Sequence, residues 1–176
     1  MYTPKCVVNK FNELDFNKLY DEGYRIIISD LDNTLAPYTM ITPTEELKEE
    51  IGKIKRMGFK FYLISNNKQE RIEHFCHELG LDGYLAKAKK PNPTKLQQFL
   101  QSQNIYTEDV IALGDQLVTD ILGFNRLNLY SVLVKTIDKK TQKWYTKINR
   151  LREKKILKNI KKSNYEIYRK IEEIYE

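Results

Sequence analysis

Asp30 and Asp32, one residue apart, are the side chains of this chain best suited to chemistry. They follow an uninterrupted apolar run, residues 26–28, which is typical of a strand buried on both faces of a parallel sheet. Open α/β sheets bind their ligands at the carboxyl ends of such strands. Two carboxylates placed there repel each other unless a cation or a shared proton compensates, and hard oxygen donors suit Mg²⁺. The pair therefore predicts a divalent-metal site, although a D-x-D pattern on its own is as often a solvated turn.

Polar groups also follow the later apolar runs. They are Ser65, Asn66 and Asn67 after the second run, Lys87, Lys89 and Lys90 after the third, and Asp115 and Asp120 after the fourth. A hydroxyl with two amides can hold a phosphoryl oxygen without adding charge, and a lysine can neutralise that oxygen. The two later acids can face the first pair if their strand lies beside the first strand. Taken singly, each group is more often an ordinary turn or a solvated charge.

Strand and helix patterns alternate along the body of the chain. Apolar runs predict five strands near residues 26–28, 59–64, 84–86, 110–113 and 131–134, with helices between them. Residues 1–24 predict a lead-in with a short helix near 15–21. The intervals between the strands hold one helix each. No large additional domain that would enclose a substrate, called a cap domain, fits between them.

The charge of the chain is unevenly distributed. Residues 139–176 carry 13 Lys and Arg against 5 Glu, whereas residues 1–138 carry 17 basic and 19 acidic side chains. We therefore expect one domain over residues 1–138, which is long enough for a hydrophobic core, and a basic helical extension over residues 139–176. A basic extension is directed toward a polyanionic surface such as anionic lipid or RNA.

The apolar residues of this extension recur at helical spacing, which predicts one long helix or two. One interpretation is an interfacial helix whose lysines meet anionic lipid while Trp144 and Tyr145 enter the head-group region. The other is an ordinary terminal helix that packs on the body. The stripe through Leu151 suits a core position, and the segment from Ile156 suits a membrane surface better.

The remaining composition bounds the location of the protein. No apolar run approaches the length of a membrane span, and the first residues lack the apolar stretch of a secretory signal. Cys6 and Cys76 lack the spacing of metal ligands, which is typical of a reduced cytosolic protein. The sequence thus predicts a cytoplasmic protein, with a peripheral position on the inner face of the membrane if the extension binds lipid.

Four motifs occur in order between Asp30 and Asp120: Asp-Leu-Asp-Asn-Thr-Leu, Ser-Asn-Asn, Lys-Ala-Lys-Lys-Pro and Gly-Asp-Gln-Leu-Val-Thr-Asp. Together they resemble motifs I to IV of the haloacid dehalogenase (HAD) superfamily. In detail they are similar to subclass IIIA, in particular its YqeG-type branch, which is related to the phosphatidylglycerophosphate phosphatases of mitochondria and plastids. The resemblance implies an α/β fold, a HAD-like Rossmannoid three-layer sandwich with a parallel sheet of strand order 5-4-1-2-3 and no large cap.

The resemblance also implies roles for the motif residues. The implied catalytic residues are Asp30 as nucleophile, Asp32 as general acid and base, Ser65 for positioning the phosphoryl group and Lys90 for neutralising it. The implied Mg²⁺ ligands are Asp30, Asp32 through its backbone carbonyl, Asp115 and Asp120, and Asn33, Thr34 and Asn66 are the expected substrate-binding residues. Lys90, directly before a proline, matches the family pattern best, and Lys87 and Lys89 remain alternatives.

These features predict a Mg²⁺-dependent phosphomonoesterase. A site without a cap favours a phosphorylated substrate that brings its own bulk, in first place the phospholipid phosphatidylglycerophosphate at an anionic membrane surface. One alternative is an HAD phosphatase for a nucleotide, a sugar phosphate or a macromolecular phosphate. Another is a non-catalytic module that binds RNA or the ribosome, although a nucleic-acid partner is less favoured. The oligomeric state stays open.

Overall fold

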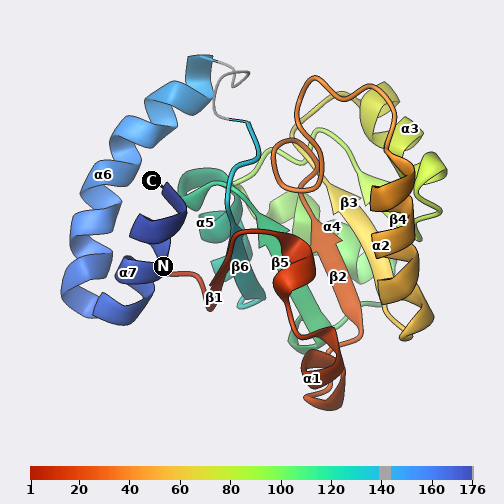
Figure 1. Cartoon of the computed structure of the whole chain (residues 1–176), viewed down its shortest axis with the longest axis horizontal. Coiled ribbons are helices and arrows are strands. Elements are labelled where there is room, and N and C mark those ends of the chain that lie inside the picture. Colours follow the sequence, from red (N-terminus) through yellow and green to blue (C-terminus); the bar gives the residue numbers. More distant parts are fainter. Residues whose placement is uncertain (139–143, 176) are drawn as a thin grey trace.

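The chain folds around one open, six-stranded sheet in which all pairings are parallel (Figure 1). This computed structural model describes residues 1–138 and 144–175, and the side chains of residues 144–151 lie outside the described part. The strands are β1 (Cys6–Val8), β2 (Ile26–Ser29), β3 (Lys60–Ile64), β4 (Gly83–Leu85), β5 (Val110–Gly114) and β6 (Tyr130–Val134). Their order across the sheet is β1-β6-β5-β2-β3-β4.

The predicted fold class is confirmed, and the strand order needs one addition. Strands β2 to β6 have the expected order 5-4-1-2-3, but the N-terminal lead-in supplies a sixth strand, β1, which pairs with β6 at the edge of the sheet. The sequence did not predict β1 because three residues are too few to show a period. β1 depends on its pairing with β6, where Cys6 aligns with Val132.

Helices connect the strands. They are α1 (Phe16–Asp21), α2 (Glu45–Arg56), α3 (Gln69–Glu78), α4 (Thr94–Ser102), α5 (Leu122–Asn125), α6 (Trp144–Ser163) and α7 (Tyr165–Tyr175), with the π-helical turn η3 (Leu117–Ile121) and the 3₁₀ turns η1 (Phe11–Glu13) and η2 (Thr107–Asp109). The predicted short helix near 15–21 is α1, whose N-cap Asp15 accepts a hydrogen bond from the Lys18 amide. Thr44 caps α2 in the same way through the Leu47 amide.

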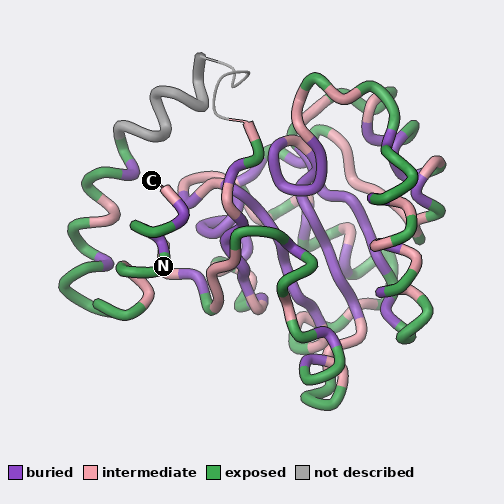
Figure 2. The backbone as a smooth tube through the Cα atoms, viewed as in Figure 1, coloured by how far each residue is buried: buried purple, intermediate pink, exposed green. Residues whose placement is uncertain are grey.

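Apolar side chains fill both faces of the sheet. On one face Ile27, Phe61 and Ile111 pack with residues of α1, α2 and α3, including Ile51 and Phe75. The opposite face of the same strands belongs to a second cluster, which includes side chains of α4 and α5. Figure 2 shows the buried backbone running through the central strands. Because β2 and β5 are covered on both faces, the positions at which the loops leave their carboxyl ends are fixed.

The described part of the C-terminal extension packs on the body. Ile160 of α6 and Ile171 and Ile174 of α7 are buried in a cluster with Leu117 and Leu133, beside the β1 edge of the sheet (Figure 1). These residues of the apolar stripe therefore serve as core, as the second interpretation of the extension required. The expectation that the apolar stripe from Ile156 suits a membrane surface better is wrong, because this stripe packs on the body. The side chains of Trp144, Tyr145 and Leu151 lie outside the described residues. No helix in the described part is long and apolar enough to cross a membrane.

We expect α7 to contribute to stability through Ile171, which is fully buried. Ile171→Ala should lower the free energy of unfolding by about 2–5 kcal/mol, because the change removes buried methyl groups and leaves a cavity. Ile41→Ala is the matched control, since Ile41 is 81% exposed. Urea denaturation followed by circular dichroism measures both variants. Equal midpoints for the two variants would show that α7 does not belong to the cooperative unit.

Candidate active site

The site lies at the carboxyl edge of the two central strands. Ser29, the last residue of β2, aligns with Leu113 of β5, and the Asp30 amide continues the ladder by donating to the Leu113 carbonyl at 2.9 Å. Asp30 and Asp115 therefore emerge from neighbouring strands at the same edge. Asp115 and Asp120 were expected to face the first pair of acids if their strand lies beside the first strand. Because β2 and β5 are neighbours, that condition is met.

Three carboxylates converge at this edge. One oxygen from each of Asp30, Asp115 and Asp120 lies within 4.8 Å of the others, and all three residues are buried. Gly114 makes this approach feasible, because a β-carbon at that position would lie 2.3 Å from the Asp120 β-carbon. Asp120 sits in the π-helical turn η3, and its Oδ2 accepts from the Gln116 amide at 3.1 Å. Turns of this kind are frequent at functional sites.

Lys90 is the lysine that the structure brings to the three carboxylates. Its Nζ lies 2.8 Å from Asp30 Oδ1, 2.7 Å from Asp120 Oδ1 and 2.9 Å from the Ile64 carbonyl oxygen. All three ammonium protons thus have acceptors. Lys87 and Lys89, the two alternatives, are exposed. The catalytic role of Lys90 stays a prediction, but it is the lysine with the required position.

Lys90 pairs with two of the three carboxylates. Its ammonium contacts Asp30 and Asp120, and Asp115 belongs to the same buried group of acids. Burial, with the charges of Asp120 and Asp32, outweighs the attraction of Lys90 and raises the pKa of Asp30 to about 7. Burial disfavours the charged form of Lys90 as well, yet the Asp120 and Asp30 carboxylates raise its pKa above the ordinary value. The lysine therefore stays charged, and Asp30 requires either a proton or a further cation.

Asp32 lies outside this cluster and forms a separate ion pair. The guanidinium of Arg71 donates to Asp32 Oδ1 from Nε at 2.9 Å and from Nη2 at 2.8 Å. The side-chain amide of Asn67 donates to Asp32 Oδ2 at 2.8 Å. Arg71 is itself held by the Met40 carbonyl, at 2.6 Å from Nη1. The side chain of Asp32 is thereby oriented by α3 and by the loop that precedes it.

Ser65 and Asn66 occupy the end of β3. The Ser65 side chain is almost fully buried, and its Oγ accepts from the backbone amide of Asn67 at 3.2 Å. Asn66 clamps the backbone of Lys90, donating to its carbonyl at 3.0 Å and accepting from its amide at 2.7 Å. Asn66 thus has a structural duty next to Lys90, and the substrate-binding role expected for it stays a prediction.

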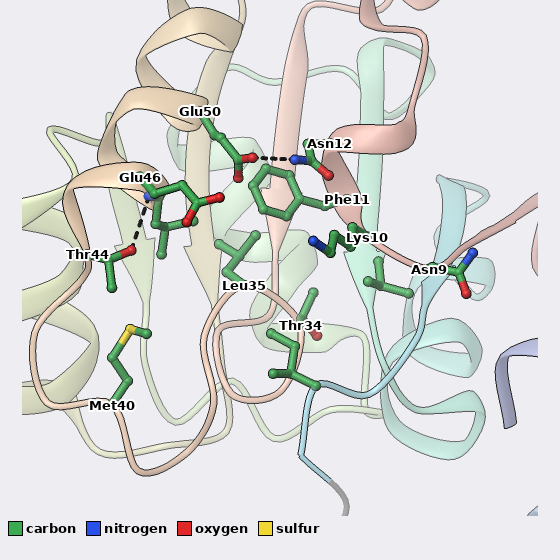
Figure 3. Close-up of a pocket in the computed structure, with 13 residues that line it drawn as sticks. Asn9, Lys10, Phe11, Asn12, Thr34, Leu35, Met40, Thr44, Glu46 and Glu50 are labelled. Carbon is green, nitrogen blue, oxygen red and sulfur yellow. Dashed lines mark hydrogen bonds between the residues drawn. The ribbon is translucent and has the colours of Figure 1, made fainter. Parts of the chain in front are cut away.

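The structure turns the two other expected substrate-binding residues toward different neighbours. Asn33 Oδ1 accepts from the Asp138 amide at 3.3 Å, which ties the loop after β2 to the chain after β6. Thr34 lines a cavity of about 210 Å³ between this loop, the start of α2 and residues 9–12 (Figure 3). Its buried hydroxyl has no hydrogen-bond partner within the described part of the chain. The roles expected for both residues remain untested.

Several residues at the site were not predicted. Thr136, after β6, donates to Asp115 Oδ2 at 2.9 Å, and Glu153 of α6 accepts from the Leu117 amide at 3.0 Å, two residues beyond Asp115. Arg71 holds Asp32, and so does Asn67, which was predicted as a donor to a phosphoryl oxygen and not as a partner of Asp32. In sequence Arg71 and Glu153 resemble solvated helix positions, and the signal available in advance was only that Asn67 belongs to the Ser-Asn-Asn motif.

Comparisons with known proteins agree with this arrangement. Residues 7–128 match the haloacid dehalogenase-like hydrolase family. The Bacillus subtilis protein "Probable phosphatase YqeG" is 30% identical over 164 residues, which span 93% of this chain and 94% of that protein.

Two solved structures share the fold. The cobalt-bound deoxy-D-mannose-octulosonate 8-phosphate phosphatase from Haemophilus influenzae has a TM-score of 0.54 and 14% identity, covering 66% of this chain and 70% of its own. The D,D-heptose 1.7-bisphosphate phosphatase from B. bronchiseptica, complexed with magnesium and phosphate, has a TM-score of 0.52 and 15% identity, covering 64% and 81%.

The chain therefore belongs to the haloacid dehalogenase-like hydrolase family. Within that family it is a phosphatase of the HAD type, as the family match and the relative that matches it over nearly its whole length indicate.

The raised pKa of Asp30 predicts a pH dependence of stability in metal-free protein. In the unfolded chain Asp30 loses its proton near its ordinary pKa of about 3.9, whereas the folded protein retains it up to about 7. Between these values the folded state binds more protons, so stability should fall as the pH rises. Asp30→Asn lacks this titration. Its free energy of unfolding should therefore rise relative to that of the wild type as the pH increases to about 7. Urea denaturation in EDTA measures the difference, and parallel pH curves for the two proteins would contradict the assigned pKa.

Proposed function

We propose that this chain is a Mg²⁺-dependent phosphomonoesterase that acts through an aspartyl phosphate on Asp30. The observation that carries the proposal is the buried group of Asp30, Asp115 and Asp120, in which Lys90 pairs with Asp30 and Asp120. Membership of the hydrolase family supports it. A carboxylate that attacks a phosphate ester must approach a like charge, so the site needs cations on both sides of the phosphoryl group.

The residues present fit a magnesium ion. Asp30, Asp115 and Asp120 offer hard carboxylate oxygens that lie close to one another, which is the ligand type that Mg²⁺ prefers. We assign the ligands to Asp30, Asp115 and the backbone carbonyl of Asp32, with Asp120 as a further ligand or as the group that orients one. When bound, Mg²⁺ would offset the charge of the phosphoryl oxygens and of the attacking carboxylate.

The protein residues carry the steps of the reaction. The Asp30 carboxylate attacks phosphorus and the bond to the leaving alcohol breaks, while Asp32 supplies the proton that the leaving oxygen takes up. Asp32 then removes a proton from the water that attacks phosphorus, which breaks the bond to Asp30 and releases phosphate. Arg71 and Asn67 hold the Asp32 carboxyl in place. Within the described part of the chain Oδ2 accepts from Asn67 alone, so it retains a lone pair for the proton. Lys90 and Ser65 steady the phosphoryl oxygens.

Removal of the nucleophile tests this mechanism. Asp30→Asn should lower the turnover of 4-nitrophenyl phosphate with Mg²⁺ by roughly a thousandfold or more, because the amide oxygen cannot form the intermediate. EDTA should abolish the wild-type activity, and added Mg²⁺ should restore it. Asp21→Asn is the control, since Asp21 is exposed at the end of α1. Wild-type turnover by Asp30→Asn would refute the assignment of the nucleophile.

For the natural substrate we propose a phospholipid phosphomonoester, phosphatidylglycerophosphate, met by a peripherally bound enzyme at an anionic membrane surface. Two observations support this choice. From Asp30 to Lys90 the chain forms only α2, β3, α3 and β4, so no cap encloses the site. The exposed residues of α6 include Lys154, Lys155, Lys158, Lys161 and Lys162, and its one acid, Glu153, is buried.

The lysines of α6 provide the test. Replacing Lys155, Lys158 and Lys162 by Gln should weaken binding to vesicles that contain phosphatidylglycerol by about tenfold or more, because each lysine near such a surface contributes about 1 kcal/mol. Sedimentation with vesicles at low salt measures binding, and wild-type binding should weaken as salt is added.

The control for these variants removes the same charge elsewhere. Lys18, Lys53 and Lys60 are exposed on the body of the protein, and their replacement by Gln should leave vesicle binding near the wild-type value. No wild-type binding at low salt would refute the membrane proposal while leaving the phosphatase proposal intact.

A further inference from the structure

A basic pocket opens beside the catalytic carboxylates. It has a volume of about 510 Å³, in the range of small-molecule sites, and its lining includes Tyr38, Asn66, Asn67, Lys68, Arg71 and Lys87. We call it the mouth pocket. Its residues come from three segments, the loop after β2, the stretch from the end of β3 into α3, and the loop after β4. All three segments lie at the carboxyl edge of the sheet, where the three acids converge.

The mouth pocket is in direct contact with the proposed reaction centre. Arg71 and Asn67 line the pocket and bind the two carboxylate oxygens of Asp32. Asn66 lines it and clamps the backbone of Lys90. Since Asp32 is proposed to protonate the leaving oxygen, the alcohol part of the substrate must extend past Asp32. Because both side chains that bind the Asp32 carboxylate line the mouth pocket, the pocket is placed to receive that part of the substrate.

The charge of the pocket identifies what that alcohol carries. Arg71 is neutralised by Asp32, but within residues 1–138 and 144–175 neither Lys68 nor Lys87 forms an ion pair. Glu70 also lines the pocket, so the two lysines leave one positive charge in excess. Asn67 fixes both lysines through their backbones, since its carbonyl accepts from the Lys87 amide at 3.0 Å and its Oδ1 accepts from the Lys68 amide at 2.8 Å.

We propose that the mouth pocket binds a second anionic group, carried by the alcohol part of the phosphomonoester substrate. The inference rests on the proposed function and narrows its substrate class to phosphate esters whose leaving group carries a further anion, which the experiment below supplies as a second phosphate. That phosphate is a monoester in a soluble bisphosphate and a diester in a phospholipid such as phosphatidylglycerophosphate. Lys68 and Lys87 bind it, while Asn67 keeps them in register with Asp32.

The experiment compares matched substrates with and without the second anion. In the soluble arm, propane-1,3-diol bisphosphate is compared with propane-1,3-diol monophosphate. In the lipid arm, phosphatidylglycerophosphate is compared with dodecyl phosphate in the same detergent micelles. In at least one arm the wild type should prefer the substrate with the second anion by about tenfold in kcat/KM, mainly through KM, and less at high salt. The arm with the larger preference identifies the source of the anion.

Variants then assign the preference to the pocket. Replacing Lys68 and Lys87 by Gln should reduce the ratio of the two kcat/KM values by about tenfold, to near one. Lys60→Gln, an exposed charge at the start of β3 and so at the opposite end of the strands, should leave the ratio unchanged.

The outcomes separate this inference from the proposed function. A wild type that hydrolyses the phosphates without preference in either arm, or a preference that survives both substitutions, overturns the inference alone. A chain that hydrolyses none of the four substrates, nor 4-nitrophenyl phosphate, overturns the proposed function and the inference with it.

Discussion

The structure of the site depends on the convergence of buried charges. The carboxylates of Asp30, Asp115 and Asp120 lie close to one another, and the ammonium of Lys90 pairs with Asp30 and Asp120. Removing such charges from water costs free energy unless they are paired. The raised pKa of Asp30 reflects this desolvation cost. The carboxylate oxygens are hard ligands of the kind that a divalent cation prefers, which is the basis of the proposed Mg²⁺ site beside the phosphate ester.

The rest of the fold keeps these charges together. Burial of β2 and β5 on both faces fixes the origin of Asp30 and Asp115, and Gly114 leaves the space that Asp120 occupies. The C-terminal helices take part as well, because Glu153 of α6 accepts from the Leu117 amide within the turn that carries Asp120. The extension is therefore connected to the site by packing and by hydrogen bonding, in addition to the surface of lysines that α6 exposes.

Short-range patterns were sufficient to predict much of this architecture. The apolar runs before Asp30 and Asp115 predicted two buried strands, whereas the expectation that these strands are neighbours came from the resemblance of the four motifs to the HAD superfamily. Acids at the ends of adjacent parallel strands must meet. Contacts made by long side chains could not be predicted in the same way. Arg71 and Asp32 are 39 residues apart, and Glu153 and Leu117 are 36 apart, so no local period relates them. The choice between Lys87, Lys89 and Lys90 also required the three-dimensional path of the loop, and β1 was too short to show a pattern of its own.

The central claim, a covalent phosphoryl group on Asp30, is tested most directly by trapping it. The wild type is mixed with Mg²⁺ and 4-nitrophenyl phosphate, quenched in acid during turnover, treated with borohydride and digested for mass spectrometry. Because borohydride reduces an acyl phosphate to an alcohol, the peptide that contains residue 30 should carry a reduced side chain at that position, and protein quenched without substrate should not. Turnover without reduction at residue 30, or with reduction at another carboxylate, would contradict the account.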